Sequence, residues 1–141
     1  MSEATGLQAV LWDMDGTLVD SEKLWDVSLD ELAVHLGGQL SPATRAAMVG
    51  SSLDRTVALM FDEVGLSPDP PAIREAGRWL TARTEELFRA GLPWRPGAPE
   101  ALRLVRDSGL GTALVTSTHR ALAEVALDSI GREFFDVTVC G

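Results

Sequence analysis

Three short apolar runs, separated by long stretches of helical periodicity, constrain the fold of this 141-residue chain more than any other feature. The runs are "LQAVLW" at residues 7–12, "LGTALVTST" at 110–118 and "FFDVTVCG" at 134–141. Short and nearly continuous apolar runs are typical of strands buried in a parallel sheet. A helical segment precedes the second run and another precedes the third. This alternation predicts an α/β fold with right-handed crossovers.

Between the first and second runs, the pattern is helical throughout, and the expected helices have recognisable ends. Gly37 follows the first stretch and Gly65 follows the third, as glycines do after a last helical turn. Ser41 and Pro42 have the residue types that cap and begin a helix. No strand-like alternation interrupts these segments, so the region is predicted to contain helices only.

The chain is therefore expected to have two domains. The predicted sheet core comprises residues 1–19 and 93–141, and an all-helical insertion occupies residues 20–92. The proline-rich stretch at 92–99 is predicted to be the return from the insertion to the core, and it offers a hinge.

Charge and cysteine content exclude several classes of protein. The chain has 12 Lys and Arg against 21 Asp and Glu, which gives a net charge of −9. Nucleic-acid surfaces need clustered cations, so small molecules are the expected partners. Cys140 is the only cysteine, which rules out an internal disulfide and a CxxC metal site. No secretory signal is seen and no run approaches the roughly 18 apolar residues of a membrane span, so we expect a cytoplasmic protein without membrane contact.

Two carboxylates follow the first apolar run directly, in the stretch "VLWDMDGTLVDSE" at residues 10–22. Ligands of parallel sheets bind beyond the carboxyl ends of the strands, where Asp13 and Asp15 lie. Their spacing lets both side chains point the same way, and Gly16 then permits a sharp turn. Two adjacent anions need a proton or a cation between them, and Mg²⁺ suits oxygen ligands.

The same pair has the groups that phosphate-ester hydrolysis requires. One carboxylate can attack phosphorus, while the other protonates the leaving oxygen and later activates water. The alternative is a polar turn without chemistry, because Asp and Gly are ordinary turn residues.

The stretch "DMDGTLVDSE" resembles the first motif of the haloacid dehalogenase superfamily, which is DxDGT followed by apolar residues and an acid. "TALVTST" is similar to the second motif of that family, an apolar strand that ends in Thr or Ser. The helical insertion resembles the cap domain of the phosphoglucomutase-like branch. The resemblance implies a Rossmann-like core and a magnesium-dependent phosphatase that acts on small phosphorylated metabolites through an aspartyl-phosphate.

The resemblance also implies roles for individual residues. Asp13 is the nucleophile and Asp15 is the general acid and base. The Asp13 carboxylate and the Asp15 backbone carbonyl bind Mg²⁺, and Gly16 and Thr17 shape the loop. The implied phosphate-binding residues are Met14, Asp15, Thr116 and Ser117.

Several other residues are weaker candidates. His119 begins a helix whose positive end faces the expected crevice, so it could contact phosphate, although a polar surface residue is the better explanation. Tryptophans in the cap region can line a substrate pocket or pack in a core. These tryptophans are Trp25, Trp79 and Trp94. Two arginines, Arg55 and Arg95, are weak candidates for contacts with the substrate.

The resemblance favours a phosphatase over other members of the superfamily. Dehalogenases and phosphonate hydrolases resemble "DMDGT" but lack the second acid, which is Asp15 here. Sugar phosphomutases have a cap His at the position of Trp25 and a cap Arg near Leu53, and this chain has neither. A phosphomutase is the alternative.

Two family elements do not occur in this sequence: a Lys after the third strand and an acidic pair after the fourth. We therefore expect an incomplete core and a nearly inactive chain, because both elements neutralise charge in phosphoryl transfer. The first strand should also have an unpaired edge that promotes self-association. A non-catalytic module, which binds phosphate or oligomerises through this edge, is the second hypothesis.

Overall fold

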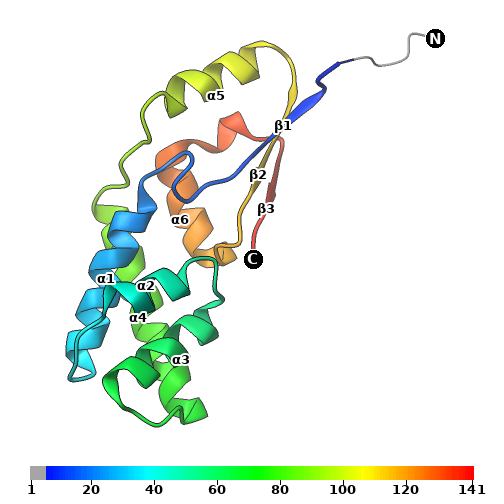
Figure 1. Cartoon of the computed structure of the whole chain (residues 1–141). Coiled ribbons are helices and arrows are strands. Elements are labelled where there is room, and N and C mark those ends of the chain that lie inside the picture. Colours follow the sequence, from blue (N-terminus) through cyan, green and yellow to red (C-terminus); the bar gives the residue numbers. More distant parts are fainter. Residues whose placement is uncertain (1–5) are drawn as a thin grey trace. The chain divides into compact units, whose positions relative to one another are not determined.

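The computed structural model describes residues 6–141 and divides the chain into two compact units. One contains the residues up to Glu22 together with Leu87–Gly141, and we call it the sheet unit. The other is Lys23–Glu86, and we call it the helical unit. Figure 1 shows strands in the first unit and only helices in the second.

The sheet unit is built on three parallel strands, β1 (Ala9–Trp12), β2 (Gly111–Val115) and β3 (Val137–Val139). They lie side by side in the order β1-β2-β3 (Figure 1). Trp12 is paired with Leu114, and Leu114 with Thr138, so the carboxyl ends of the strands meet at one edge of the sheet. The predicted α/β fold and its parallel sheet are confirmed.

Helices α5 (Ala98–Asp107) and α6 (Arg120–Ile130) connect the strands, and a short 3₁₀ helix, Arg132–Phe134, precedes β3. Strands that advance in one direction through right-handed crossovers have their helices on one face. Along β2 the side chains of Thr112 and Leu114 are buried, which marks this face. The apolar residues that α6 buries are Leu122, Ala123, Val125, Ala126, Leu127 and Ile130.

The opposite face of the sheet is apolar and exposed. Leu11 on β1 is 70% exposed, and Val137 and Val139 on β3 are 57% and 51% exposed. Ala113 lies between Leu11 and Val137 in the register, so these side chains form one continuous surface. Within the described residues, no strand pairs with the outer edge of β1. The expected unpaired edge is therefore present.

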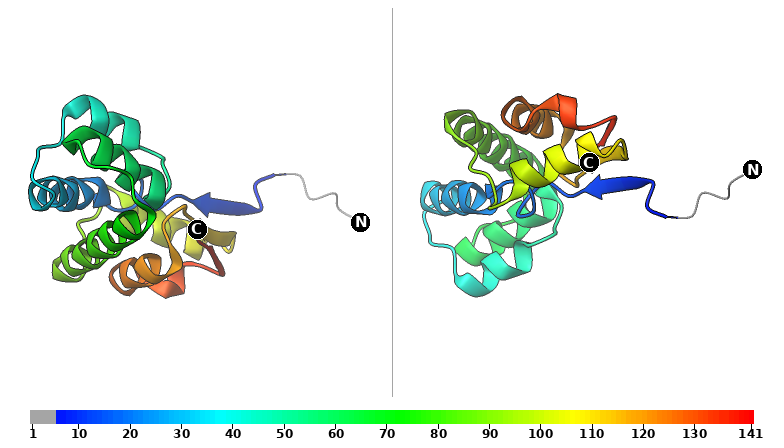
Figure 2. Two further views of the ribbon diagram at one scale, coloured as in Figure 1. Left: turned by 90° about the horizontal axis from the view of Figure 1, so that it is seen from below. Right: turned by 90° about the horizontal axis from the view of Figure 1, so that it is seen from above.

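The helical unit contains most of four helices, α1 (Ser21–His35), α2 (Pro42–Met48), α3 (Leu53–Val64) and α4 (Pro70–Ala90), drawn from blue to green in Figure 2. The first two residues of α1 and the end of α4, from Leu87, belong to the sheet unit. All four helices contribute to one apolar core, whose buried members are Leu29, Leu32, Ala33, Met48, Val57, Met60, Phe61, Ala76 and Leu80.

A charged pair ties the first and last of these helices together. The Arg83 guanidinium on α4 donates to both carboxylate oxygens of Glu31 on α1, at 2.6 and 3.1 Å. This bidentate contact holds the pKa of Glu31 below its usual value.

Helix ends follow the sequence signals. The Ser41 hydroxyl accepts the Thr44 amide at 3.2 Å, with Pro42 as the first residue of α2. Gly65 ends α3 with a left-handed φ of 75°. Both predictions are confirmed. No helix in the described part of the chain is both long enough and apolar enough to cross a membrane.

Candidate active site at the carboxyl ends of β1 and β2

The loop after β1 carries Asp13 and Asp15, and Thr116 follows β2 directly. Because β1 and β2 are parallel neighbours, both segments leave the same edge of the sheet. The Thr116 hydroxyl donates to Oδ2 of Asp15 at 3.3 Å. The structure thus brings together two motifs that lie about a hundred residues apart in the sequence.

The loop after β1 turns back sharply at Gly16, where φ is +76°. The amides of Thr17 and Leu18 donate to the Met14 carbonyl at 3.2 and 3.0 Å. The Gly16 amide donates to the Val19 carbonyl at 2.8 Å. Met14 and Leu18 are buried, which anchors the loop in the core. With its side chain fully buried, Met14 can meet a phosphate group only through its backbone.

Asp15 is enclosed by hydroxyl groups. Ser21, the first residue of α1 and wholly buried, donates to Oδ1 at 2.5 Å. Thr118 donates to Oδ2 at 2.5 Å, on the same oxygen as Thr116. Donors on both oxygens fix the plane of the carboxylate, because rotating it breaks charge-assisted hydrogen bonds.

Asp13 is open by contrast. Its side chain is exposed, and its Oδ2 accepts the Thr17 hydroxyl at 3.0 Å. Within the described residues, its other oxygen has no hydrogen-bond donor. One carboxylate is therefore free to react or to bind a cation, while its neighbour is held still.

The segment after β2 adds possible anion ligands. Ser117 is exposed, and His119 is the residue that precedes the first turn of α6. The His119 side chain makes no capping hydrogen bond, so the first amides of α6 are not satisfied by it. Amides at a helix N-terminus favour negative charge.

The donor set fits Mg²⁺. The free oxygen of Asp13 is a hard ligand, and because the Asp15 carboxylate is engaged by hydroxyls, its backbone carbonyl is the group left to coordinate. No cluster of three or more His, Cys, Asp or Glu side chains occurs among residues 6–141. Mg²⁺ usually takes one or two carboxylates and obtains its other ligands from water and phosphate.

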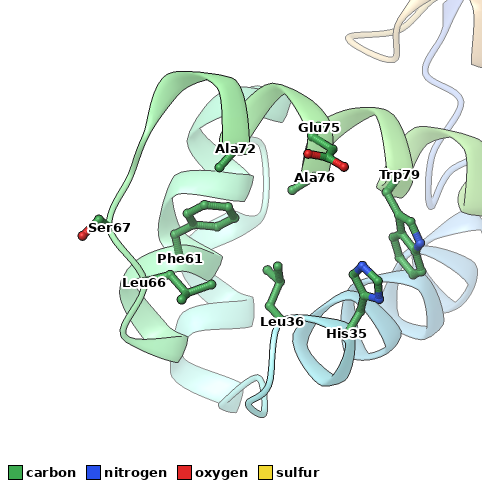
Figure 3. A pocket seen from close by; sticks show the side chains of 9 residues that line it. All are labelled: His35, Leu36, Phe61, Leu66, Ser67, Ala72, Glu75, Ala76 and Trp79. Carbon is green, nitrogen blue, oxygen red and sulfur yellow. The ribbon is translucent and has the colours of Figure 1, made fainter.

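Three of the weaker candidates belong to the helical unit. Trp25 and Trp79 pack against its core, and Arg55 is exposed on α3. Trp79 also stacks on His35, with ring centroids 5.3 Å apart, at the wall of a cavity of about 340 Å³ (Figure 3). Trp79 therefore both packs against the core and lines a cavity, the two alternatives that the sequence left open.

The other weaker candidates lie on the segment before α5. The Arg95 amide donates to the Leu18 carbonyl, and the Asp20 amide to the Pro93 carbonyl, both at 2.8 Å. Trp94 is half-buried and forms an isolated bridge with Val19. The two segments that join the units therefore run side by side.

Ser21 and Thr118 are site residues that sequence reasoning missed. Both lie inside the quoted motifs, as the serine of "VDSE" and the second threonine of "VTST". The hydroxyl residue types were the only available signal. Which hydroxyl reaches Asp15 depends on how two loops fold against each other.

A parallel sheet with an acidic loop after one strand and hydroxyl residues after the next defines a Rossmann-like α/β protein with a site at the strand ends. The family model described as haloacid dehalogenase-like hydrolase matches residues 7–141. The chain belongs to this family of hydrolases, as the motif resemblance predicted.

Curated relatives of the chain are named as phosphatases. Hexitol phosphatase B of Escherichia coli strain K12 is 29% identical over 138 residues, which cover 96% of this chain and 61% of the relative. Phosphoglycolate phosphatase of Chromobacterium violaceum is 28% identical over 138 residues, with 96% and 62% covered. The chain thus spans about three fifths of the length of these relatives.

Solved structures share the fold. CbbY from Rhodobacter sphaeroides, determined in complex with phosphate, superimposes with a TM-score of 0.80 at 25% identity, covering 96% of this chain and 64% of that one. A predicted phosphoglycolate phosphatase from Haemophilus somnus has a TM-score of 0.84 at 19% identity, covering 99% and 64%, and shows likeness of fold alone.

Proposed function

We propose that the natural protein containing this chain is a magnesium-dependent phosphatase that hydrolyses small phosphorylated metabolites through a phosphorylated Asp13. The observation that carries the proposal is the contrast between the two acids. Asp13 is exposed and has a free oxygen, whereas Asp15 beside it is held by three hydroxyls. The family and the phosphatase names of its relatives support the same activity.

Each residue of the site has a role in this proposal. Asp13 attacks phosphorus, and Asp15 gives a proton to the leaving oxygen and later takes one from water. Thr116, the Ser117 amide and the Met14 backbone hold the phosphoryl oxygens. Gly16 and Thr17 keep the acidic loop in its turned conformation.

Mg²⁺ would be held by the Asp13 carboxylate and the Asp15 carbonyl, and it would neutralise charge on the phosphoryl group. The helical insertion, residues 20–92, is proposed to act as a cap for the core of residues 1–19 and 93–141, and to exclude water while Asp13 attacks the substrate. Cytoplasmic location remains a prediction.

The test is phosphate release from sugar phosphates and p-nitrophenyl phosphate by the natural protein. Asp13→Asn should abolish Mg²⁺-dependent release, because an amide is a poor nucleophile. Asp107→Asn, an exposed acid at the end of α5, is the matched control and should leave turnover unchanged. Equal turnover in Asp13→Asn and the original protein would refute the proposal.

We also propose that two copies of this chain, when it is isolated, associate with each other. The exposed apolar face and the unpaired edge of β1 favour it. This proposal concerns the sheet unit only and does not depend on catalysis.

A further inference from the structure

The helical unit contains a cavity of about 340 Å³, and none of its lining residues has a role in the proposed phosphatase reaction. The walls come from α1, α3 and α4 and the turns that follow α1 and α3, all within Lys23–Glu86 (Figure 3). Ala72 and Ala76 lie one turn apart on α4, and their short side chains leave room beside Phe61. A cavity of this volume is in the range of pockets that bind small molecules.

Glu75 on α4 gives the cavity a carboxylate with no partner in the described part of the chain. The residue is exposed and makes no hydrogen bond or ion pair there. Its neighbours along the helix, Arg74 and Arg78, line a separate groove together with Leu53. Among the described residues, no Lys or Arg lines the cavity. An exposed carboxylate alone is no binding site, but the groups next to Glu75 add to its attraction for a cation.

Trp79 lies one turn after Glu75 on α4, so its indole is the neighbour of this carboxylate on the helix surface. The indole stacks on the His35 imidazole of α1, with ring centroids 5.3 Å apart and planes 11° from parallel (Figure 3). This stack restrains the indole at the cavity wall. Among aromatic side chains, tryptophan attracts cations most strongly, and more so where water is excluded.

Two helices end at this cavity and add partial negative charge. His35 is the last residue of α1, and Leu66 comes shortly after Val64, the last residue of α3. The carboxyl end of a helix carries about half a negative elementary charge. Together with Glu75, these ends make the cavity attractive to cations, while most of its lining side chains are apolar.

We propose that this cavity binds a small organic cation, namely a protonated amine with an aromatic or alkyl body. The body packs against Phe61 and Leu36, and the ammonium group lies beside Glu75 and Trp79. The ligand is distinct from the phosphate ester, and the proposal does not depend on the phosphatase activity.

The test is an NMR titration of the natural protein that follows the indole N–H resonance of Trp79, assigned by its loss in Trp79→Phe. The probe is phenethylammonium at about pH 8, where histidine is ordinarily neutral. The matched neutral probe is 2-phenylethanol, which has the same aromatic body without the charge. We expect a Kd of about 0.1–1 mM for the amine and binding at least about tenfold weaker for the alcohol.

Three variants locate the bound probe. Glu75→Gln keeps the shape of the exposed side chain and removes its charge, so the affinity for the amine should fall about tenfold and that for the alcohol should not change. Ala72→Leu fills the hollow and should weaken the binding of both probes. Asp62→Asn, an exposed acid on α3 outside the cavity, should leave both affinities unchanged, which controls for the net charge of −9.

Several results would overturn the proposal. One is equal affinity for the amine and the alcohol, and another is an amine affinity that stays the same in Glu75→Gln or in Ala72→Leu. A Trp79 resonance that does not move with up to about 10 mM amine would also overturn it. A loss in Asp62→Asn as large as that in Glu75→Gln would assign the binding to overall charge and not to the cavity.

Discussion

Ser21 donates its hydroxyl to Oδ1 of Asp15 at 2.5 Å, which ties the first turn of α1 to the loop after β1. The Ser21 side chain is wholly buried, so water cannot replace it as a donor. The residue that begins the inserted helices therefore also helps to hold the carboxylate of the candidate site.

Ser21→Ala should lower phosphatase activity without unfolding the protein. Removal of the donor on Oδ1 lets the Asp15 carboxylate rotate out of its position beside Asp13, and we expect kcat/KM to fall about tenfold. Ser28→Ala is the matched control, because Ser28 is equally buried in α1 but bonds to Trp25 and Thr84. Comparable losses in both variants would mean that the effect comes from helix packing.

Gly16→Ala and Gly77→Ala should have opposite effects on stability. Gly16 has φ +76°, and an added Cβ would lie 2.9 Å from Oε1 of Glu22, so the free energy of unfolding should fall by about 1–2 kcal/mol. Gly77 lies inside α4, where a Cβ meets only the Leu53 side chain at 3.5 Å. Alanine there should stabilise by about 0.5–1 kcal/mol. Urea unfolding measures both, and a stabilised Gly16→Ala contradicts the loop geometry.

Asp136 should stabilise the sheet unit only above acidic pH. Its carboxylate accepts from the Arg106 guanidinium at 2.7 Å and the Thr112 amide at 2.9 Å, and these contacts hold its pKa below the usual 3.8. Because the pKa is lower in the folded state, the stabilisation is present above the unfolded pKa and is lost as the pH falls through the folded one.

The measurement is Tm for Asp136→Asn against the original chain. We expect a lower Tm for the variant at about pH 7, with a difference that shrinks as the pH falls through the folded-state pKa of Asp136. Both partners are about half exposed, so added salt should shrink the difference. A difference that persists at acidic pH would assign the effect to packing.

This chain in isolation should show a concentration-dependent mass in sedimentation equilibrium. Leu11→Lys places a charge on the edge strand and on the exposed sheet face, and it should shift the protein to monomer. Leu104→Lys on α5 is a close control, because Leu104 is 72% exposed and Leu11 is 70% exposed. A monomeric original chain, or an equal shift in both variants, contradicts association through β1.

Much of the fold could be predicted because the local signals agree with one another. The apolar run at residues 7–12 contains β1, and the cap at Ser41 and the glycine at Gly65 mark real helix ends. These features depend on neighbouring residues alone. The short 3₁₀ helix at Arg132–Phe134 gave no comparable signal, since three residues carry no periodicity.

The candidate site could be predicted only in part. Asp13, Asp15 and Thr116 follow strands, and parallel strands bring their carboxyl ends together, so their proximity follows from the topology. The contrast between an open Asp13 and an enclosed Asp15 does not follow from it. That contrast depends on Thr118 and Ser21, whose hydroxyls reach Asp15 only after the two loops and the start of α1 have packed.

The most direct test of the central claim is mass spectrometry of the Asp13 peptide from the natural protein, after incubation with p-nitrophenyl phosphate, whose leaving group needs no proton from Asp15, and a rapid acid quench. Asp15→Asn is used for the trap, because it slows hydrolysis of the acyl-phosphate. The account predicts one phosphoryl group on Asp13 in this variant and none when Asp13 is also replaced by Asn. A phosphoryl group on another residue, or an unmodified Asp13 in a protein that still releases phosphate, would contradict it.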